Sequence, residues 1–371
     1  MQNPTVAYAR HPVVFTGSET EYRRLWLRNV ALLLITVGAS FPWAMVSKAR
    51  YFYRHTQVAG HALAYHANPL KLFLGNLAGS VVLNSLYFGI SKTGSFKAIG
   101  FGAVQLLMGL LTPLMLHGLL EFKLTHTSWR GQRLGLSARP HEAFKALGLP
   151  TLAYVLSAVL VVWALVISRE PQIMPALWLG GLGLAGLSFA LPWMYWRFKN
   201  YQHRHAVLGP IQNEHDTARH SWREWGACVG AALMTLLALA VSLLLAWGLS
   251  SRLGLNAQSL DRLAQGHLPD VLIVVLVTVP SVFLGTAIIM ALPYPYLSVH
   301  LQNRLWARTG HHQLRFESEV PLGPLLKLTA RNWVLIVLTL GFYYPHAAIA
   351  EARLRLQSVS VLLPLEEGHA G

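Results

Sequence analysis

The chain has 371 residues, of which 54% are hydrophobic and only 12% are charged. A soluble domain usually has about one quarter charged residues, so this composition excludes an ordinary soluble domain. The 30 Lys and Arg outnumber the 15 Asp and Glu, which gives a formal net charge of +15. These basic residues are dispersed over separate loops rather than along one soluble face, so the charge does not indicate nucleic-acid binding.

Long apolar windows follow a polar N-terminal segment, residues 1–25. Six windows have no Asp, Glu, Lys or Arg over 18 residues or more, and they cover residues 72–90, 98–116, 146–167, 171–192, 225–247 and 271–292. A helix of about 20 residues crosses a hydrocarbon core about 30 Å thick, so each window predicts a transmembrane helix. The predicted fold class is an all-α polytopic bundle, and we expect residues 1–371 to form a single membrane domain.

Two further apolar segments, residues 30–46 and 333–350, are shorter and are broken by Gly and Pro. If both cross the membrane, the fold has eight spans. If both enter and leave on one side, six spans remain, and the C-terminal tail, residues 357–371, lies on the same side as the N-terminus. We favour the re-entrant arrangement, because it keeps the basic residues of both ends with those of the loops. The eight-span arrangement stays open.

Charge alternates between successive connections. Four of them hold 19 Lys and Arg in total, and they cover residues 47–71, 117–147, 195–223 and 296–331. The three connections between them, residues 91–97, 168–173 and 248–270, hold five. By the positive-inside rule the first set is predicted to be cytoplasmic.

A short pattern recurs after five prolines, which are Pro42, Pro113, Pro192, Pro295 and Pro345. A polar residue stands eight positions after each proline, a His or Arg stands thirteen positions after the first four, and a Thr stands fourteen positions after three of them. The first and last copies also share an Asn thirteen positions before the proline, Asn29 and Asn332, and a Thr-x-Gly that ends at Gly38 and Gly341. This spacing predicts an internal duplication.

The first 75 residues also carry a family motif. The motif residues are Phe15, Gly17, Glu21, Tyr22, Thr36, Gly38, Pro42, Trp43, Ala44, Val46, Arg50, Tyr51, Phe52, Tyr53, Thr56 and Gly60. This set resembles the YjgN family of bacterial inner-membrane proteins, although Ala39-Ser40-Phe41 and Ser47-Lys48 depart from its pattern. The resemblance implies a multi-pass protein of the inner membrane. The family has no assigned biochemical activity, so the resemblance supplies no catalytic residue.

The sequence contains no recognised signature of catalysis or of metal binding. The six long windows contain no ionisable Asp, Glu, Lys or Arg, which argues against a proton-coupled carrier or an ion pump and leaves a facilitator open. The 17 histidines form no zincin pattern, and the single cysteine, Cys228, does not join them. Phosphate-binding loops and nucleophile elbows are absent. We therefore expect no enzyme activity, no cofactor, no metal and no nucleic-acid partner.

The basic and aromatic segments of the predicted cytoplasmic loops are candidates for binding anions or lipid head groups. The candidate residues are Arg50, Arg54, His55, Lys123, Arg130, Lys199, Arg204, Arg304 and Arg308. Anionic lipid attracts each nearby Lys or Arg by about 1 kcal/mol, so generic lipid contact is an alternative explanation. The leading hypothesis is a protein that binds, or translocates, a lipidic or small anionic ligand. Its alternative is an accessory protein that positions a partner, such as an envelope protease or complex, or a second copy of the chain. An enzyme that acts on a lipid is least favoured.

Overall fold

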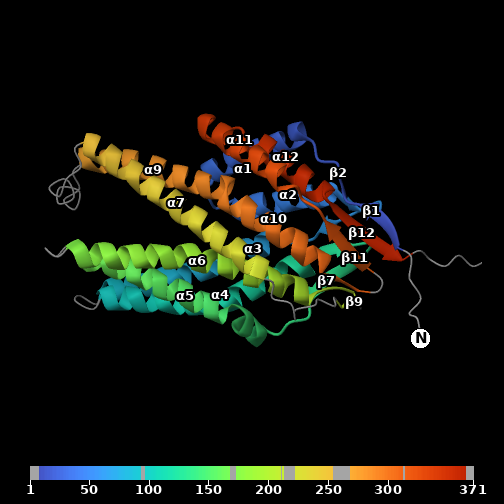
Figure 1. The fold of residues 1–371 in the computed structure, drawn as a ribbon, viewed down its shortest axis with the longest axis horizontal. Coiled ribbons are helices and arrows are strands. Elements are labelled where there is room, and N and C mark those ends of the chain that lie inside the picture. The colour runs from blue at the N-terminus through green and yellow to red at the C-terminus, as the bar shows by residue number, and fades with distance from the viewer. Residues whose placement is uncertain are drawn as a thin grey trace, which may run out of the picture.

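The computed structural model describes residues 8–92, 97–167, 173–209, 211–212, 222–253, 268–311 and 314–364 (Figure 1). Parts of the predicted N-terminal segment, of the C-terminal tail and of several connections lie outside these residues.

Helices dominate the described residues. The helices are α1 (Glu19–Ile35), α2 (Phe41–Arg54), α3 (Pro69–Ser91), α4 (Lys97–Thr125), α5 (Pro140–Ile167), α6 (Ile173–His205), α7 (Trp222–Arg252), α9 (Leu268–Ala291), α10 (Pro293–Ala307), α11 (Leu322–Leu338) and α12 (Tyr344–Gln357). The strands are β1 (Tyr8–Pro12), β2 (Val14–Phe15), β3 (Thr56–Val58), β4 (His61–Ala62), β5 (Ala64–Tyr65), β6 (Thr127–Trp129), β7 (Gln132–Leu136), β8 (Ala206–Leu208), β9 (Ile211–Gln212), β10 (Gly310–His311), β11 (Leu314–Ser318) and β12 (Val359–Pro364).

Six stretches of helix are long and apolar enough to cross a membrane. They are Pro69–Ile90, Gly102–Thr125, Pro140–Ala164, Met174–His205, Trp222–Arg252 and Val271–Ala307, and each overlaps one predicted window. The prediction of a mostly helical bundle with six membrane-spanning helices is therefore confirmed. Helices α4 and α6 run past their apolar windows, so the basic segments that follow are continuations of the same helices.

The two short apolar segments each fold as a helical hairpin, α1–α2 and α11–α12, with the same turn. The hydroxyls of Thr36 and Thr339 donate to the carbonyl oxygens four residues earlier at 2.7 Å, and accept the backbone N–H four residues later at 3.1 and 3.0 Å. Gly38 and Gly341 follow with φ of +87° and +93°, a conformation that favours glycine. The repeated Thr-x-Gly thus encodes a turn. The common origin of the two segments stays a prediction.

The repeated His and Thr residues end helices. The hydroxyls of Thr56, Thr127 and Thr309 donate to the carbonyl oxygens four residues earlier, at 2.8, 2.8 and 2.6 Å. His55 and His126 each place Nδ1 2.8 Å from the carbonyl oxygen four residues earlier, and their rings lie 4.3 and 4.2 Å from the aromatic rings at those positions. These bonds satisfy carbonyl groups that a helix end would otherwise leave unpaired.

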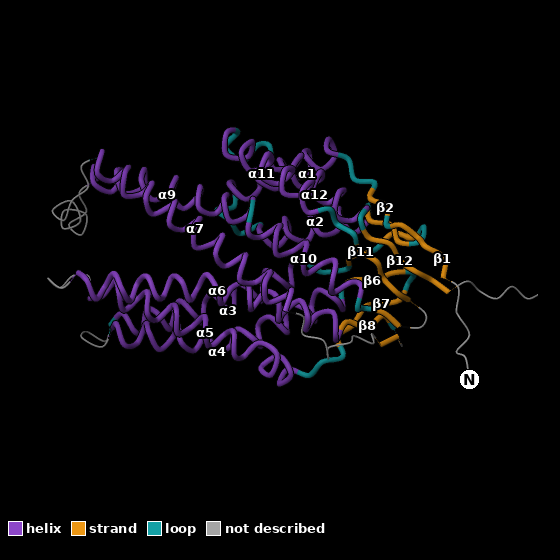
Figure 2. The backbone as a smooth tube through the Cα atoms, in the orientation of Figure 1, coloured by secondary structure: helices purple, strands orange, loops and turns teal. Residues whose placement is uncertain are grey.

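The strands gather at one end of the bundle, which we call the strand end (Figure 2). They form three antiparallel sheets, with the orders β1-β12-β11-β10, β2-β3-β4 and β5-β6-β7-β8-β9. Apolar residues of all three sheets share one core, which includes Val58, Leu208, Leu314 and Val361. In the first sheet β1 pairs with β12, Tyr8 opposite Pro364, so both ends of the described chain lie at the strand end.

Sequence patterns did not predict these strands. Two of the hairpins turn through pairs of residues with positive φ, Ala59-Gly60 and Arg130-Gly131. Such turns are usually recognised from Asn-Gly or Asp-Gly, and Ala or Arg at the first position gives no such signal. The strands are also only two to six residues long, which is too short for alternation to be read.

Candidate functional site

A groove of ≈ 530 Å³ lies between α1, α2 and the start of α3. Its apolar lining consists of Leu25, Leu32, Trp43, Val46 and Pro69, and its polar lining consists of Arg28, Asn29, Ser47, Arg50, Tyr51, Arg54 and His55. We call it the arginine groove. It brings together three of the predicted site residues, Arg50, Arg54 and His55, and adds Arg28, which was not among the predicted site residues.

The three arginines of the groove retain most of their hydrogen-bonding capacity. Arg50 donates from Nη2 to the carbonyl oxygen of Ala67 at 2.8 Å, which ties α2 to the residues that precede α3. Arg28 and Arg54 are exposed, and neither forms a hydrogen bond or ion pair with another described residue. No carboxylate is among the groove's lining residues, so the groove carries a net positive charge.

The remaining polar groups hold the groove in shape. Asn29 Nδ2 donates to Ser47 Oγ at 2.9 Å, which braces α1 against α2. The Tyr51 hydroxyl donates to the Ser18 carbonyl oxygen and accepts the Ser18 N–H, both at 2.8 Å. Burial raises the pKa of Tyr51 above its usual range, so this phenol stays neutral and keeps both bonds near neutral pH.

His55 lies at the strand end of the groove. Its Nε2 is 3.6 Å from Glu21 Oε2, while its Nδ1 contacts the helix end described above. Both ring nitrogens of His55 are therefore engaged by other groups of this chain.

Lys123 and Lys199 lie away from the arginine groove, at the ends of α4 and α6. Lys123 and Arg355 of α12 are electrostatic neighbours of Lys199. Lys199 Nζ donates to Gln202 Oε1 at 3.0 Å and lies 5.7 Å from the centre of the Tyr195 ring. The structure thus brings cations from α4, α6 and α12 toward one another.

The other four predicted site residues are distributed over the strand end. Arg308 forms an ion pair with Glu224 at 2.8 Å, and Glu224 is only 1% exposed. Arg304 has a buried Nη1 for which no hydrogen-bond partner is found among the described residues. Arg130 lies in the β6–β7 turn and donates to His61 Nδ1 at 3.3 Å, while Arg204 is exposed at the end of α6.

Metal chemistry has no candidate ligand set in the described part of the chain, where no group of three His, Cys, Asp or Glu side chains converges. The absence of a metal and of a cofactor stays a prediction.

The sequence profile of a family described as bacterial proteins of unknown function (DUF898) matches residues 10–366. The chain belongs to this family. The inner membrane protein YjgN of Salmonella typhimurium is 30% identical over 183 residues, which are 48% of this chain and 45% of that protein. YjgN of Escherichia coli O157:H7 is 30% identical over 129 residues, 34% of this chain and 31% of that protein. The alignments thus cover less than half the length of these curated relatives. No solved structure matches the chain significantly.

The family assignment confirms the resemblance of the first 75 residues. The names of the relatives and the six apolar helices together place the protein in the bacterial inner membrane as a multi-pass protein. The relatives' names state a location and no activity, so the function has to be argued from the site.

Proposed function

We propose that the protein is a non-enzymatic inner-membrane protein that binds an anionic lipid head group in the arginine groove. The observation that carries this proposal is the lining of the groove. Three arginines and no carboxylate lie beside an apolar wall that includes Leu32 and Trp43. A phosphate group matches guanidinium donors, and an acyl chain matches the apolar wall.

The exposed tips of the two hairpins support contact with the membrane. Val37 and Leu340, at the centres of the turns, are 94% and 87% exposed, and Leu34, Ile35, Leu338 and Phe342 beside them are also mostly exposed. Water-exposed apolar turns of this kind are unfavourable, whereas lipid would cover them. Both hairpins begin and end toward the strand end, so we propose that their tips dip into the membrane from that side.

The distribution of charge supports a cytoplasmic strand end. The described parts of the four connections that are rich in Lys and Arg contain strands β3 to β11 at this end, which agrees with the positive-inside rule. Arg28 lies seven residues before the end of α1, and Arg50 nine residues after the start of α2. Both are therefore roughly 10–14 Å from the hairpin tip. A tip near the bilayer centre would put the backbone of these arginines just inside the edge of the hydrocarbon core, since half a core is about 15 Å thick, and their long side chains would reach outward to the phosphates.

Helix α3 favours a second function, that of positioning a partner protein or a second copy. No residue in its apolar span is buried by the rest of the described chain. It exposes Gly75 and Gly79, a spacing that permits close approach of another helix, and the amide of Asn84 bonds only its own helix. A specific membrane partner recovered by cross-linking from α3, with no discrete lipid bound, would favour this function.

The double variant Arg28→Ala/Arg54→Ala tests the lipid proposal. Native mass spectrometry of the detergent-extracted protein, titrated with phosphatidylglycerol, is expected to show a loss of at least tenfold in bound lipid, since each arginine contributes about 1 kcal/mol. Arg23→Ala/Arg24→Ala is the matched control, because these exposed arginines lie on α1 and do not line the groove. Equal losses in both variants would mean generic surface attraction and would overturn the proposal.

A further inference from the structure

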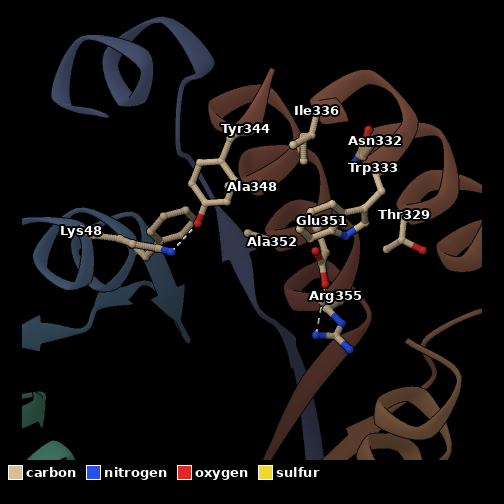
Figure 3. Close-up of a pocket in the computed structure, with 12 residues that line it drawn as sticks. Lys48, Thr329, Asn332, Trp333, Ile336, Tyr344, Ala348, Glu351, Ala352 and Arg355 are labelled. Atoms are coloured by element: carbon tan, nitrogen blue, oxygen red, sulfur yellow. Dashed lines mark hydrogen bonds and ion pairs between the residues drawn. The ribbon is translucent and has the colours of Figure 1, made fainter. Parts of the chain in front are cut away.

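A second cavity, of ≈ 300 Å³, lies between the two hairpins, where α2 faces α11 and α12. Figure 3 shows its side chains, with Lys48 on one wall and Glu351, Trp333 and Arg355 on the other. Small residues of α12, Ala347, Ala348 and Ala352, leave the space between these walls. We call it the inter-hairpin cavity, and it shares no lining residue with the arginine groove.

Two polar atoms of its lining have unmet hydrogen-bonding capacity. Asn332 is 3% exposed, and its Oδ1 accepts no hydrogen bond in the described structure. Arg355 Nε is likewise buried and donates to no described residue. Leaving a buried acceptor or donor unpaired usually costs about 1–3 kcal/mol, so such atoms are rare in native structures. The terminal torsion of an Asn side chain is soft, so the amide can turn toward the cavity.

Charges of both signs surround these atoms. Lys48 Nζ donates to the Tyr344 hydroxyl at 2.6 Å and has no carboxylate partner among the described residues. Glu351 Oε1 lies 3.3 Å from Arg355 Nη1, one helical turn along α12. Arg355 also donates to Ser298 of α10, which fixes its guanidinium at the cavity. The lining therefore offers cationic donors, Lys48 and Arg355, and acceptors, Glu351 and Asn332.

We propose that the inter-hairpin cavity binds a molecule that carries a protonated amine and an anionic group a few bonds apart, the chemistry of phosphoethanolamine. Lys48 and Arg355 bind the anionic group, and Glu351 and Asn332 accept hydrogen bonds from the ammonium. Phe52 and Trp333 provide apolar contacts for the carbon atoms between the two groups. A simple anion would leave Asn332 Oδ1 unpaired, since it has no N–H to donate.

Two sources could supply this chemistry, a lipid with an ethanolamine head group or a free aminophosphate or amino acid. The same cavity would accept either, so the experiment includes both. The proposal does not rest on the arginine groove, and phosphatidylglycerol, which has no amine, serves as the probe that separates the two sites.

The test uses the full-length protein in detergent, titrated with phosphatidylethanolamine, phosphatidylcholine or phosphatidylglycerol and followed by native mass spectrometry. Wild-type protein is expected to retain one phosphatidylethanolamine about tenfold better than phosphatidylcholine, whose quaternary amine has no N–H for Asn332 or Glu351. In the variants Asn332→Leu and Glu351→Gln, the retention of phosphatidylethanolamine and that of phosphatidylcholine should differ by no more than about twofold. Neither variant should alter retention of phosphatidylglycerol.

Asn76→Leu is the matched control, since Asn76 lies on α3 and lines neither cavity. The melting temperature of Asn332→Leu should stay the same or rise, because an unpartnered buried amide is removed. If Asn332 binds the ligand, Asn332→Leu should be at least as stable as wild-type protein and bind less phosphatidylethanolamine. If Asn332 only contributed to packing, binding would not fall while stability rose. If Asn332→Leu fails to fold, Glu351→Gln carries the test, because Glu351 is partly exposed.

Free phosphoethanolamine that displaces the lipid would support the proposal and identify the soluble source, whereas retention of the lipid against it would support the proposal with a lipid ligand. The proposal is overturned if wild-type protein binds phosphatidylethanolamine and phosphatidylcholine equally. It is also overturned if both cavity variants keep the wild-type preference. If wild-type protein retains no phosphatidylglycerol but keeps its preference for phosphatidylethanolamine, the proposed function is contradicted and this inference stands.

Discussion

The hairpins α1–α2 and α11–α12 have matching turns and different side chains on matching positions. Six residues after its proline, the first hairpin has Lys48 and the second has Glu351. Ten residues after it, the first has Phe52 and the second has Arg355. The turn depends on bonds within five residues, so its sequence requirements are local. The charged residues at matching positions can therefore differ. The first hairpin contributes the arginines of the arginine groove, and the second contributes Glu351 and Arg355 to the inter-hairpin cavity.

The largest expected effect concerns the membrane position of the two tips. Val37→Cys and Leu340→Cys, each in a Cys228→Ser background, should both resist a membrane-impermeant maleimide applied to either face of sealed vesicles, because lipid covers the tips. His61→Cys, in the exposed β3–β4 hairpin, should be labelled only from the cytoplasmic face. If one tip is labelled from the outside, that hairpin crosses the membrane and the two hairpins are not alike.

A smaller effect tests whether the two turns are energetically equivalent. Gly38→Ala and Gly341→Ala should each lower the free energy of unfolding by about 1–2 kcal/mol, because an L side chain is strained at positive φ. Both positions have open space around an added Cβ, so the cost is one of backbone conformation. Thermal unfolding followed by tryptophan fluorescence measures it.

The control for the turns is Gly79→Ala, a helical glycine of α3 with open space around it. This change should be neutral or stabilising by up to about 1 kcal/mol, since alanine favours a helix. Unequal losses in the free energy of unfolding at Gly38 and Gly341 would show that the residues around each turn, and not the turn conformation, determine the loss.

The smallest effect concerns the contact between the hairpins. Tyr344→Phe removes the hydroxyl that accepts from Lys48 and should cost up to about 1 kcal/mol, a value reduced by the exposure of Lys48. Phe41 holds the matching position in the first hairpin and is 53% exposed, so Phe41→Tyr should be neutral. A double-mutant cycle that combines Tyr344→Phe with Lys48→Met measures the coupling energy between these two side chains. A coupling energy of zero would mean that their hydrogen bond does not stabilise the contact between the hairpins.

The candidate site was predicted only in part. Arg50, Arg54 and His55 do share the arginine groove, because they follow one another within two turns of a single helix. Arg28 comes from the opposing helix, and its place in the groove depends on the hairpin turn. Lys48, Glu351 and Arg355 were not predicted as site residues. Lys48 and Glu351 each stand six residues after a repeated proline, Pro42 and Pro345. This matching offset was a sequence signal that could have identified both as candidate residues.

By itself the sequence determined the six spans, the hairpin turns and the helix ends. Charge-free length decides whether a helix can cross a membrane, and the bonds of Thr36 and of Thr56 reach only four residues along the chain. Tertiary structure decided the strand pairing and both cavities. Tyr8 pairs with Pro364, and Lys48 bonds Tyr344, across most of the chain. Such distant pairs form because the helices pack in one arrangement, and no local hydrogen-bonding rule specifies that arrangement.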